Sequence, residues 1–251
     1  MFLIFITINY LLTALGASFV YFVKETDKKL ISAALGLSAG IMIAASFFSL
    51  LLPALNLLEG QSKLSLLVIP FGFLLGVLFL FFCDKLLPHE HMLSQDKEGI
   101  LSKLPQKNLL MLAMTLHNIP EGFAVGVAFA SALDNPLPAI ILSLGIGIQN
   151  IPEGIAISLP MHSKGYTKNK AFLFGQFSGL IEIPSAIIGY LCASLISNVL
   201  PVALSLAAGA MLFVCVEELI PEATHKNTID IGAISCMMGF IIMMILDITL
   251  S

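Results

Sequence analysis

Residues 116–122 read LHNIPEG and residues 148–154 read IQNIPEG, so one polar pattern recurs after 32 residues. Both copies lie within long apolar stretches, which predict membrane-spanning helices. An ionised side chain at the centre of a bilayer costs at least about 2.5 kcal/mol, so the glutamate of each copy is expected to face protein, a cavity or a cation. The two copies therefore predict a polar centre inside a helical membrane protein.

The composition supports this prediction over the whole chain. The 251 residues are 58% hydrophobic and 11% charged, with a mean hydropathy of +0.98, which is far more apolar than a soluble chain of this length. About 20 apolar residues of helix cross a bilayer. We expect a single polytopic domain over residues 1–251, all-α, with eight transmembrane helices. These are residues 2–23, 30–58, 64–82, 109–132, 137–160, 171–195, 201–221 and 230–250.

The distribution of lysine predicts the orientation. All twelve basic residues are lysines, and eleven of them lie in loops that follow odd-numbered spans, whereas only Lys63 lies in another loop. By the positive-inside rule these loops are cytoplasmic and both termini are extracytoplasmic. The longest such loop covers residues 83–108, approximately. Short loops and the lack of a targeting segment favour a prokaryotic cytoplasmic (inner) membrane.

Other features exclude alternative classes. The first span is not expected to be a signal peptide, because no basic residue precedes it and its apolar run is too long. The four cysteines are widely separated, so neither a CxxC zinc site nor a disulfide framework is predicted. The net charge is −4 and the chain has no basic patch interleaved with aromatic residues, so nucleic-acid binding is not expected.

Helical spacing brings the polar residues of each motif onto one face. Residues three and four positions apart project from the same side of a helix. They are His117, Asn118 and Glu121 in the first motif and Gln149, Asn150 and Glu153 in the second. Crowded carboxylates repel unless they take up protons or a cation. Imidazole, carboxylate and amide groups without thiolate suit Zn²⁺, Fe²⁺ or Mn²⁺, so a divalent-metal site midway through the membrane is predicted.

Proline and glycine flank each glutamate. Pro120 and Pro152 cannot donate a backbone hydrogen bond to the carbonyl four residues earlier, which predicts a kink at each polar turn. Such a break is tolerated at membrane depth where the backbone is buried or lines a wet cavity. Gly122 and Gly154 lack side chains and are expected to allow a neighbouring helix to approach closely.

The tandem HNIPEG and QNIPEG, with GQFSGLIEIPS at 175–185 and GIMIAASFFSLLLPA at 40–54, resemble the ZIP family of divalent-metal transporters, most closely its GufA-like branch. The resemblance covers nearly the whole chain. It implies a 3+2+3 arrangement, in which an inverted repeat relates helices 1–3 to helices 6–8 around the central pair. It also implies transport of Zn²⁺ foremost, and of Fe²⁺, Mn²⁺ and Cd²⁺, by a protein that is not an enzyme and holds no cofactor.

The resemblance also implies two adjacent metal sites. The first contains His117, Glu121, Gln149 and Glu153. The second contains Asn118, Asn150 and Glu182 and shares the glutamates of the first. The family often has an acid at the position of Asn150, so the second site of this chain carries one negative charge fewer, which affects its occupancy and metal preference.

Further polar residues have both a functional and a structural interpretation. In EELIPEATH at 217–225, Glu217, Glu218, Glu222 and His225 could mark a cytoplasmic exit for the ion, and the alternative is that Glu222 and His225 are solvated residues at a helix end. In PHEHM at 88–92, His89 and His91 either hold a metal transiently in a regulatory loop or are simply solvated. Met42, Ser46 and Ser49 could line the outer entrance, although packing is the preferred role for the serines. Asp247 is expected near water at the outer end of the last span.

The predicted function is uptake of divalent metal into the cytoplasm. Two alternatives stay open: a membrane metal sensor without translocation, and an intramembrane metal-dependent hydrolase. No HExxH motif occurs and no soluble output domain is evident, which count against the hydrolase and the sensor respectively. The expected partners are divalent metal ions and the lipid bilayer. A homodimer is also considered, with the glycine-rich spans 30–58 and 137–160 as contact faces.

Overall fold

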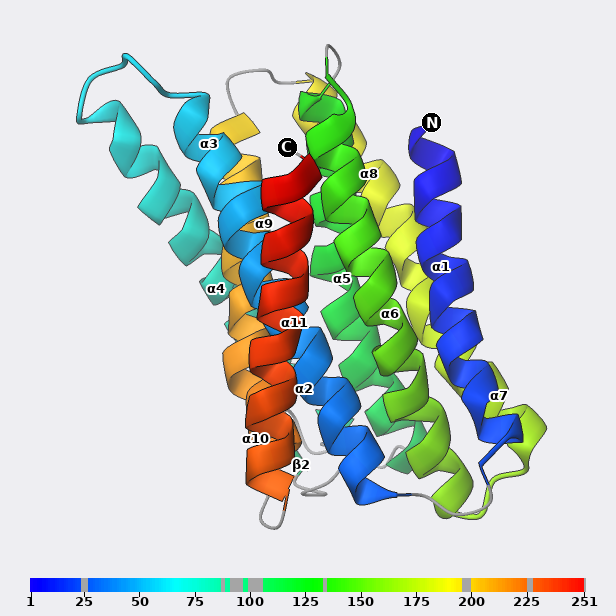
Figure 1. Cartoon of the computed structure of the whole chain (residues 1–251). Helices are drawn as coiled ribbons and strands as arrows, with labels where there is room; N and C mark the ends of the chain where they lie inside the picture. Colours follow the sequence, from blue (N-terminus) through cyan, green and yellow to red (C-terminus); the bar gives the residue numbers. More distant parts are fainter. Residues whose placement is uncertain are drawn as a thin grey trace.

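Long helices run through the whole molecule in the computed structural model (Figure 1). It describes residues 1–23, 27–86, 89–90, 97–98, 106–132, 135–195, 200–224 and 228–250. The helices are α1 (Phe2–Ser18), α2 (Lys28–Ala45), α3 (Leu52–Asn56), α4 (Val68–Leu86), α5 (Gln106–Ser131), α6 (Leu137–Ser163), α7 (Lys168–Ser178), α8 (Glu182–Leu195), α9 (Leu200–Val214), α10 (Ile220–Ala223) and α11 (Ile229–Leu250). Two short strands, β1 (His89–Glu90) and β2 (Lys97–Glu98), pair antiparallel. The expected all-α class therefore describes the protein apart from this pair.

Seven helical stretches in the described part of the chain are long and apolar enough to cross a membrane. They are Phe2–Tyr21, Lys28–Asn56, Ser65–Leu86, Leu137–Ser163, Lys168–Ser194, Leu200–Ala223 and Ile229–Thr249. Each coincides with an expected span. Helix α5 occupies the position of the remaining one, and its 26 residues extend about 39 Å at roughly 1.5 Å per residue.

Local signals explain where several helices begin. The side chain of Asp27 accepts a hydrogen bond from the backbone N–H of Lys29 at 2.8 Å and caps α2. Thr167 caps α7 in the same way, from the N–H of Lys170 at 3.4 Å. Both side chains satisfy donors that the first turn of a helix leaves unpaired. Between α6 and α7 the chain turns at Gly165, whose φ of 91° favours glycine.

The irregular turns of the spans lie where the sequence does not predict them. Helix α2 continues into α3 through a π-helical turn, Ser46–Leu51, and α9 continues into α10 through another, Cys215–Leu219. Pro120 and Pro152 lie inside the continuous helices α5 and α6, and the kink expected at each of them stays a prediction. A single extra residue per turn, which defines a π turn, leaves little trace in the hydrophobic pattern.

Hydroxyl groups from neighbouring helices support the backbone around these two prolines. Ser185 on α8 donates its hydroxyl to the carbonyl of Ile119 at 2.5 Å, and Ser38 on α2 donates to the carbonyl of Gln149 at 3.0 Å. The carbonyls that the prolines leave without a backbone donor are those four residues earlier, at Leu116 and Ile148. The two serine bonds therefore join neighbouring helices beside the freed groups.

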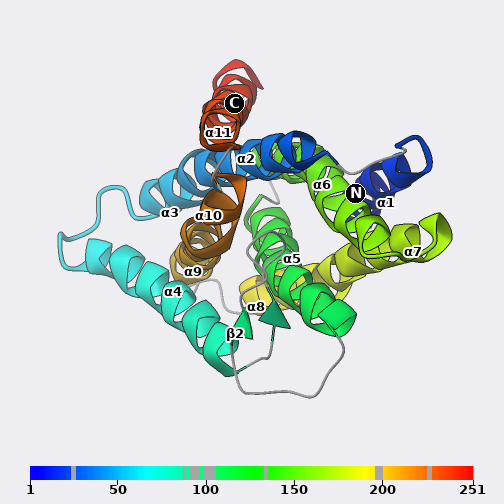
Figure 2. The ribbon, with the colours of Figure 1, turned by 90° about the horizontal axis from the view of Figure 1, so that it is seen from below.

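The helices form two groups. In one group α1 packs on α6 and α5 packs on α8, and in the other α2 packs on α11 and α4 packs on α9. The groups meet where α2 contacts α6 and where α5 contacts α9. Seen along the helices, α5 lies deep in the bundle, with α6, α8 and α9 beside it (Figure 2).

Two further features concern the chain ends and the glycines. Helix α1 begins and α11 ends at the same end of the bundle, the upper end in Figure 1. Glycines of the two spans considered as dimer contact faces pack within the chain. Gly36 and Gly40 on α2 lie against the backbone of α11, and Gly154 on α6 lies against α1. These glycines therefore serve contacts between helices of one chain, and the homodimer with its contact faces stays a prediction.

Candidate metal centre

Three glutamates lie together at the midpoints of their spans. Glu121 is on α5, Glu153 is on α6 and Glu182 begins α8, and each is at most 1% exposed. The carboxyl groups of Glu121, Glu153 and Glu182 are close enough to one another for electrostatic interaction. Buried like charges at this separation repel strongly, so this arrangement requires protons or a cation to neutralise it.

Amide side chains hold Glu182 in place. Asn150 donates to both of its carboxylate oxygens, at 2.9 and 3.1 Å, and Asn118 donates to one of them at 3.2 Å. Asn150 is itself held, because Gln149 donates to its oxygen at 3.3 Å and its own nitrogen reaches the carbonyl of Asn9 at 3.3 Å. The second motif therefore forms a hydrogen-bonded frame around Glu182.

Two amide oxygens beside the glutamates are available for a ligand. The Oδ1 of Asn118 and the Oε1 of Gln149 are buried, and neither accepts a hydrogen bond from the described part of the chain. Buried acceptors without a partner are rare and costly, and a bound cation would satisfy them. Carboxylate and amide oxygens together are a donor set that suits divalent cations.

The remaining expected ligand is His117. Its backbone belongs to α5, but its side chain lies outside the described residues. Among the side chains that are described, no three His, Cys, Asp or Glu groups come close enough together to hold a metal ion. A metal at this centre would therefore need amide oxygens, or His117, in addition to the glutamates.

Close helix packing brings these groups together. A β-carbon at Gly122 would collide with the backbone of Glu182, and one at Gly154 would collide with Thr13 and Ala17 on α1. Gly122 therefore lets α8 approach α5 next to Glu121, as the sequence predicts. Gly154 lets α1 approach α6, which places the Thr13 hydroxyl in hydrogen-bonding contact with Glu182.

The sequence analysis missed several groups around the centre. Asn9 and Thr13, both fully or almost fully buried on α1, contribute to the frame. Their four-residue spacing within an apolar run was an available signal. Cys215, buried on the π turn after α9, is close enough to Glu121 and Glu153 to interact electrostatically. Its thiol is directed to the carbonyl of Ala39 at 3.8 Å.

The residues expected at the cytoplasmic exit are only partly described. Glu218 is 2% exposed and Glu222 is 3% exposed. Helix α10, which carries Glu222, lies towards the end of the molecule opposite the chain termini (Figure 1). Because Glu222 is buried, the interpretation of it as a solvated helix-end residue is wrong. His91 and His225 lie outside the described residues. His89 belongs to β1, but its side chain also lies outside them.

The opposite end carries a different polar group. Ser46 donates to the carbonyl of Met42 at 2.8 Å, in agreement with a packing role. Ser49, however, donates to the carboxylate of Asp247 on α11 at 3.1 and 3.2 Å. Ser49, Asp247 and Asn56 line a cavity of about 360 Å³. Asp247 is only 9% exposed, and the cost of an acid in an apolar span was the signal that could have identified it.

Comparisons with known proteins agree with this architecture. Residues 87–247 match the family model described as ZIP Zinc transporter. The chain is 40% identical to Zinc transporter GufA of Myxococcus xanthus, over 95% of this chain and 94% of that protein. It is 37% identical to Zinc transporter ZIPB of Bordetella bronchiseptica, over 95% and 77%, and 33% identical to Zinc transporter ZIP11 of Xenopus tropicalis, over 95% and 94%.

Proposed function

The chain belongs to the ZIP family, as a multi-pass integral membrane protein that transports divalent metal ions, and we propose that the ions cross the membrane at the polar centre of α5, α6 and α8. One observation carries this proposal: Glu121 and Glu153 meet in the buried middle of two spans, beside amide oxygens that accept no hydrogen bond from the described residues. Such a centre replaces the hydration shell of a cation that lipid would exclude.

The donor set favours reversible binding of borderline divalent ions. Glu121, Glu153, the oxygens of Asn118 and Gln149, and the imidazole of His117 form the first site in this proposal. Zinc is the principal ion, in accordance with the names of the relatives, and Fe²⁺, Mn²⁺ and Cd²⁺ are secondary. Mixed oxygen and nitrogen ligation releases zinc more readily than an all-thiolate cage does.

The second predicted metal site has fewer ligands in this proposal than in the family pattern. Asn150 uses its nitrogen to hold Glu182 and the Asn9 carbonyl, and its oxygen accepts from Gln149. It therefore acts as a positioning residue for Glu182. Asn118 and Glu182, with the shared glutamates, remain to bind a second ion.

The transport direction in this proposal is uptake. In this proposal the chain has eight spans with an inverted 3+2+3 repeat in a prokaryotic cytoplasmic membrane. Both termini lie outside, because the lysine-bearing loops belong to the cytoplasmic side. Ions enter near Ser49 and Asp247, reach the glutamates, and leave past Glu218 and Glu222 into the cytoplasm. His89 and His91, in the loop of residues 83–108, regulate release in this proposal. The whole chain acts as one transport domain, and a homodimer remains a prediction.

Metal flux into proteoliposomes of defined orientation tests this function. Wild type, Glu153→Ala and the control Glu59→Ala, which removes an exposed loop carboxylate, are compared for Zn²⁺, Fe²⁺, Mn²⁺ and Cd²⁺. We expect flux in wild type and control, and none in Glu153→Ala. Wild-type flux in Glu153→Ala would refute the site. Metal binding without flux in the wild type would favour the sensor, and no release of peptide products in the same vesicles would exclude the hydrolase.

A further inference from the structure

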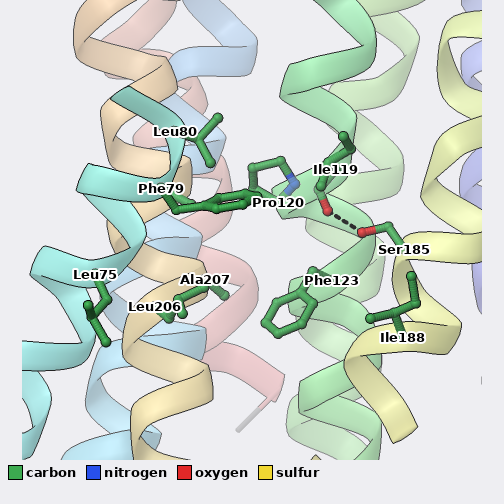
Figure 3. A pocket seen from close by; sticks show the side chains of 11 residues that line it. Leu75, Phe79, Leu80, Ile119, Pro120, Phe123, Ser185, Ile188, Leu206 and Ala207 are labelled. Carbon is green, nitrogen blue, oxygen red and sulfur yellow. Dashed lines mark hydrogen bonds between the residues drawn. The ribbon is translucent and has the colours of Figure 1, made fainter. Parts of the chain in front are cut away.

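A crevice separates the two helix groups on one side of the molecule. Helices α4 and α9 form one wall and α5 and α8 form the other, and the space between them is about 520 Å³ (Figure 3). Phe79 and Leu75 project from the first wall, and Pro120, Phe123 and Ile188 project from the second. Its volume is within the range of roughly 300–1,000 Å³ that is usual for small-molecule sites.

The lining of this crevice is almost wholly apolar. Among the lining residues only Ser185 has a hydroxyl group, and that hydroxyl already donates to the carbonyl of Ile119 at 2.5 Å. A polar or charged ligand would lose its hydration on entry and gain no hydrogen bond in return. Water needs polar partners as well, so it is also a poor occupant. The chemistry of the crevice therefore selects a hydrocarbon.

The position of the crevice identifies the source of the hydrocarbon. Phe79 is 51% exposed and Ile188 is 56% exposed on the outer surface of membrane-spanning helices, so the crevice is continuous with the surface that contacts lipid. Its residues lie near the middle of α4, α5 and α9, at the depth of the acyl chains and away from the headgroups.

We propose that this crevice is a binding site for one acyl chain of a membrane phospholipid, inserted between the two helix groups. The chain contacts Pro120, the residue before Glu121, and fills a gap where α8 and α9 make only marginal contact. The site takes lipid and not metal, and it is therefore independent of the proposed transport pathway.

Photolabelling in metal-free liposomes tests the site. The probe is a phosphatidylglycerol with a diazirine at the middle of one acyl chain, present as a trace lipid, and labelled residues are located by mass spectrometry. We expect labels to concentrate on lining residues such as Phe79 and Phe123, above those on the lipid-facing Leu74 and Leu78. Equal labelling of all lipid-facing residues would overturn the proposal.

Two tryptophan variants give a matched comparison on one helix. Leu75 lines the crevice and is 37% exposed, whereas Leu78 does not line it and is 39% exposed. We expect Leu75→Trp to reduce crevice labelling severalfold, since the larger side chain occupies the space that the acyl chain would fill. Leu78→Trp should leave it unchanged, and an equal effect of both would contradict the proposal.

A second occluding variant guards against misfolding. Ala207→Phe fills the crevice from α9 and should produce the same loss as Leu75→Trp. Each variant is first compared with wild type by size-exclusion chromatography. If both occluding variants fail to fold, the distribution of labels on the wild-type protein decides between the two outcomes by itself.

Discussion

Helices α5 and α6 carry the same NIPEG sequence and use it differently. On α6, Asn150 is fully occupied by hydrogen bonds to Glu182, Gln149 and Asn9. On α5, Asn118 donates to Glu182 but keeps an oxygen without a donor in the described part of the chain. The asparagine of the α6 copy therefore helps to build the frame of the centre, and the asparagine of the α5 copy presents an atom to its ligand.

The neighbours of the two helices explain this difference. Gly154 admits α1, which supplies the Asn9 carbonyl to the α6 copy. Gly122 admits α8, which supplies Glu182 to the α5 copy. A repeated motif thus fixes the spacing of its own side chains, while the helix packed against it decides whether each of them is paired or available.

Substituting the glutamate of either copy should have the same effect on zinc uptake. We expect Glu121→Ala to lose zinc uptake as completely as Glu153→Ala, because each removes one of two carboxylates that meet at the same point. Uptake into proteoliposomes measures this, with protein amount determined by immunoblotting and Glu59→Ala as the control. Wild-type uptake by Glu121→Ala would show that the α5 copy is not part of the pathway.

Substituting the glycine of each copy should affect the protein differently, because the added methyl groups displace different helices. Either Gly→Ala change overpacks a backbone contact and should cost about 1–3 kcal/mol of unfolding free energy. Gly122→Ala displaces α8 and thereby Glu182, so it should also weaken zinc binding, which Gly154→Ala, acting on α1, should affect less.

Thermal unfolding in detergent and zinc titration measure the two effects. Gly60→Ala has no neighbour within 4 Å, but its φ of 78° makes it strained, so wild type is the better reference. Equal loss of zinc affinity in both glycine variants would contradict the assignment of α8 to the α5 copy.

Substituting Asn150 should mainly lower stability, whereas substituting Asn118 should mainly lower zinc affinity. Asn150→Ala removes donors to a buried carboxylate and should lower the unfolding free energy by about 1–2 kcal/mol. Asn118→Ala removes one weaker bond and one candidate ligand oxygen, so it should cost about 0.6 kcal/mol. Its zinc affinity should nevertheless fall by about tenfold. If Asn150→Ala weakened binding without lowering stability, Asn150 would be a ligand and not a frame.

The sequence predicts the spans better than it predicts the surroundings of the centre. Hydrophobic length located the seven apolar spans of the described chain. The Thr167 cap was not foreseen, and it begins α7 three residues before the expected start at residue 171. The faces of α5 and α6 follow from helical spacing alone. Which helices cover these faces does not follow, because the spacing within one helix does not identify its partner helix. The roles of Asn9 and Thr13 and the bond between Ser49 and Asp247 were therefore missed. The two π turns depend on packing and were missed for the same reason.

The smallest expected effects concern the serines that support the two copies. Ser185 reaches Ile119 from α8, within one helix group, whereas Ser38 reaches Gln149 from α2, across the boundary between the groups. Each Ser→Ala change should cost about 0.6 kcal/mol, the average for interhelical hydrogen bonds in membranes. If transport requires the groups to shift against each other, only Ser38→Ala breaks a bond that such a shift must break. Zinc uptake rates should then change for Ser38→Ala and not for Ser185→Ala, and identical rates in both would show that this boundary stays fixed during transport.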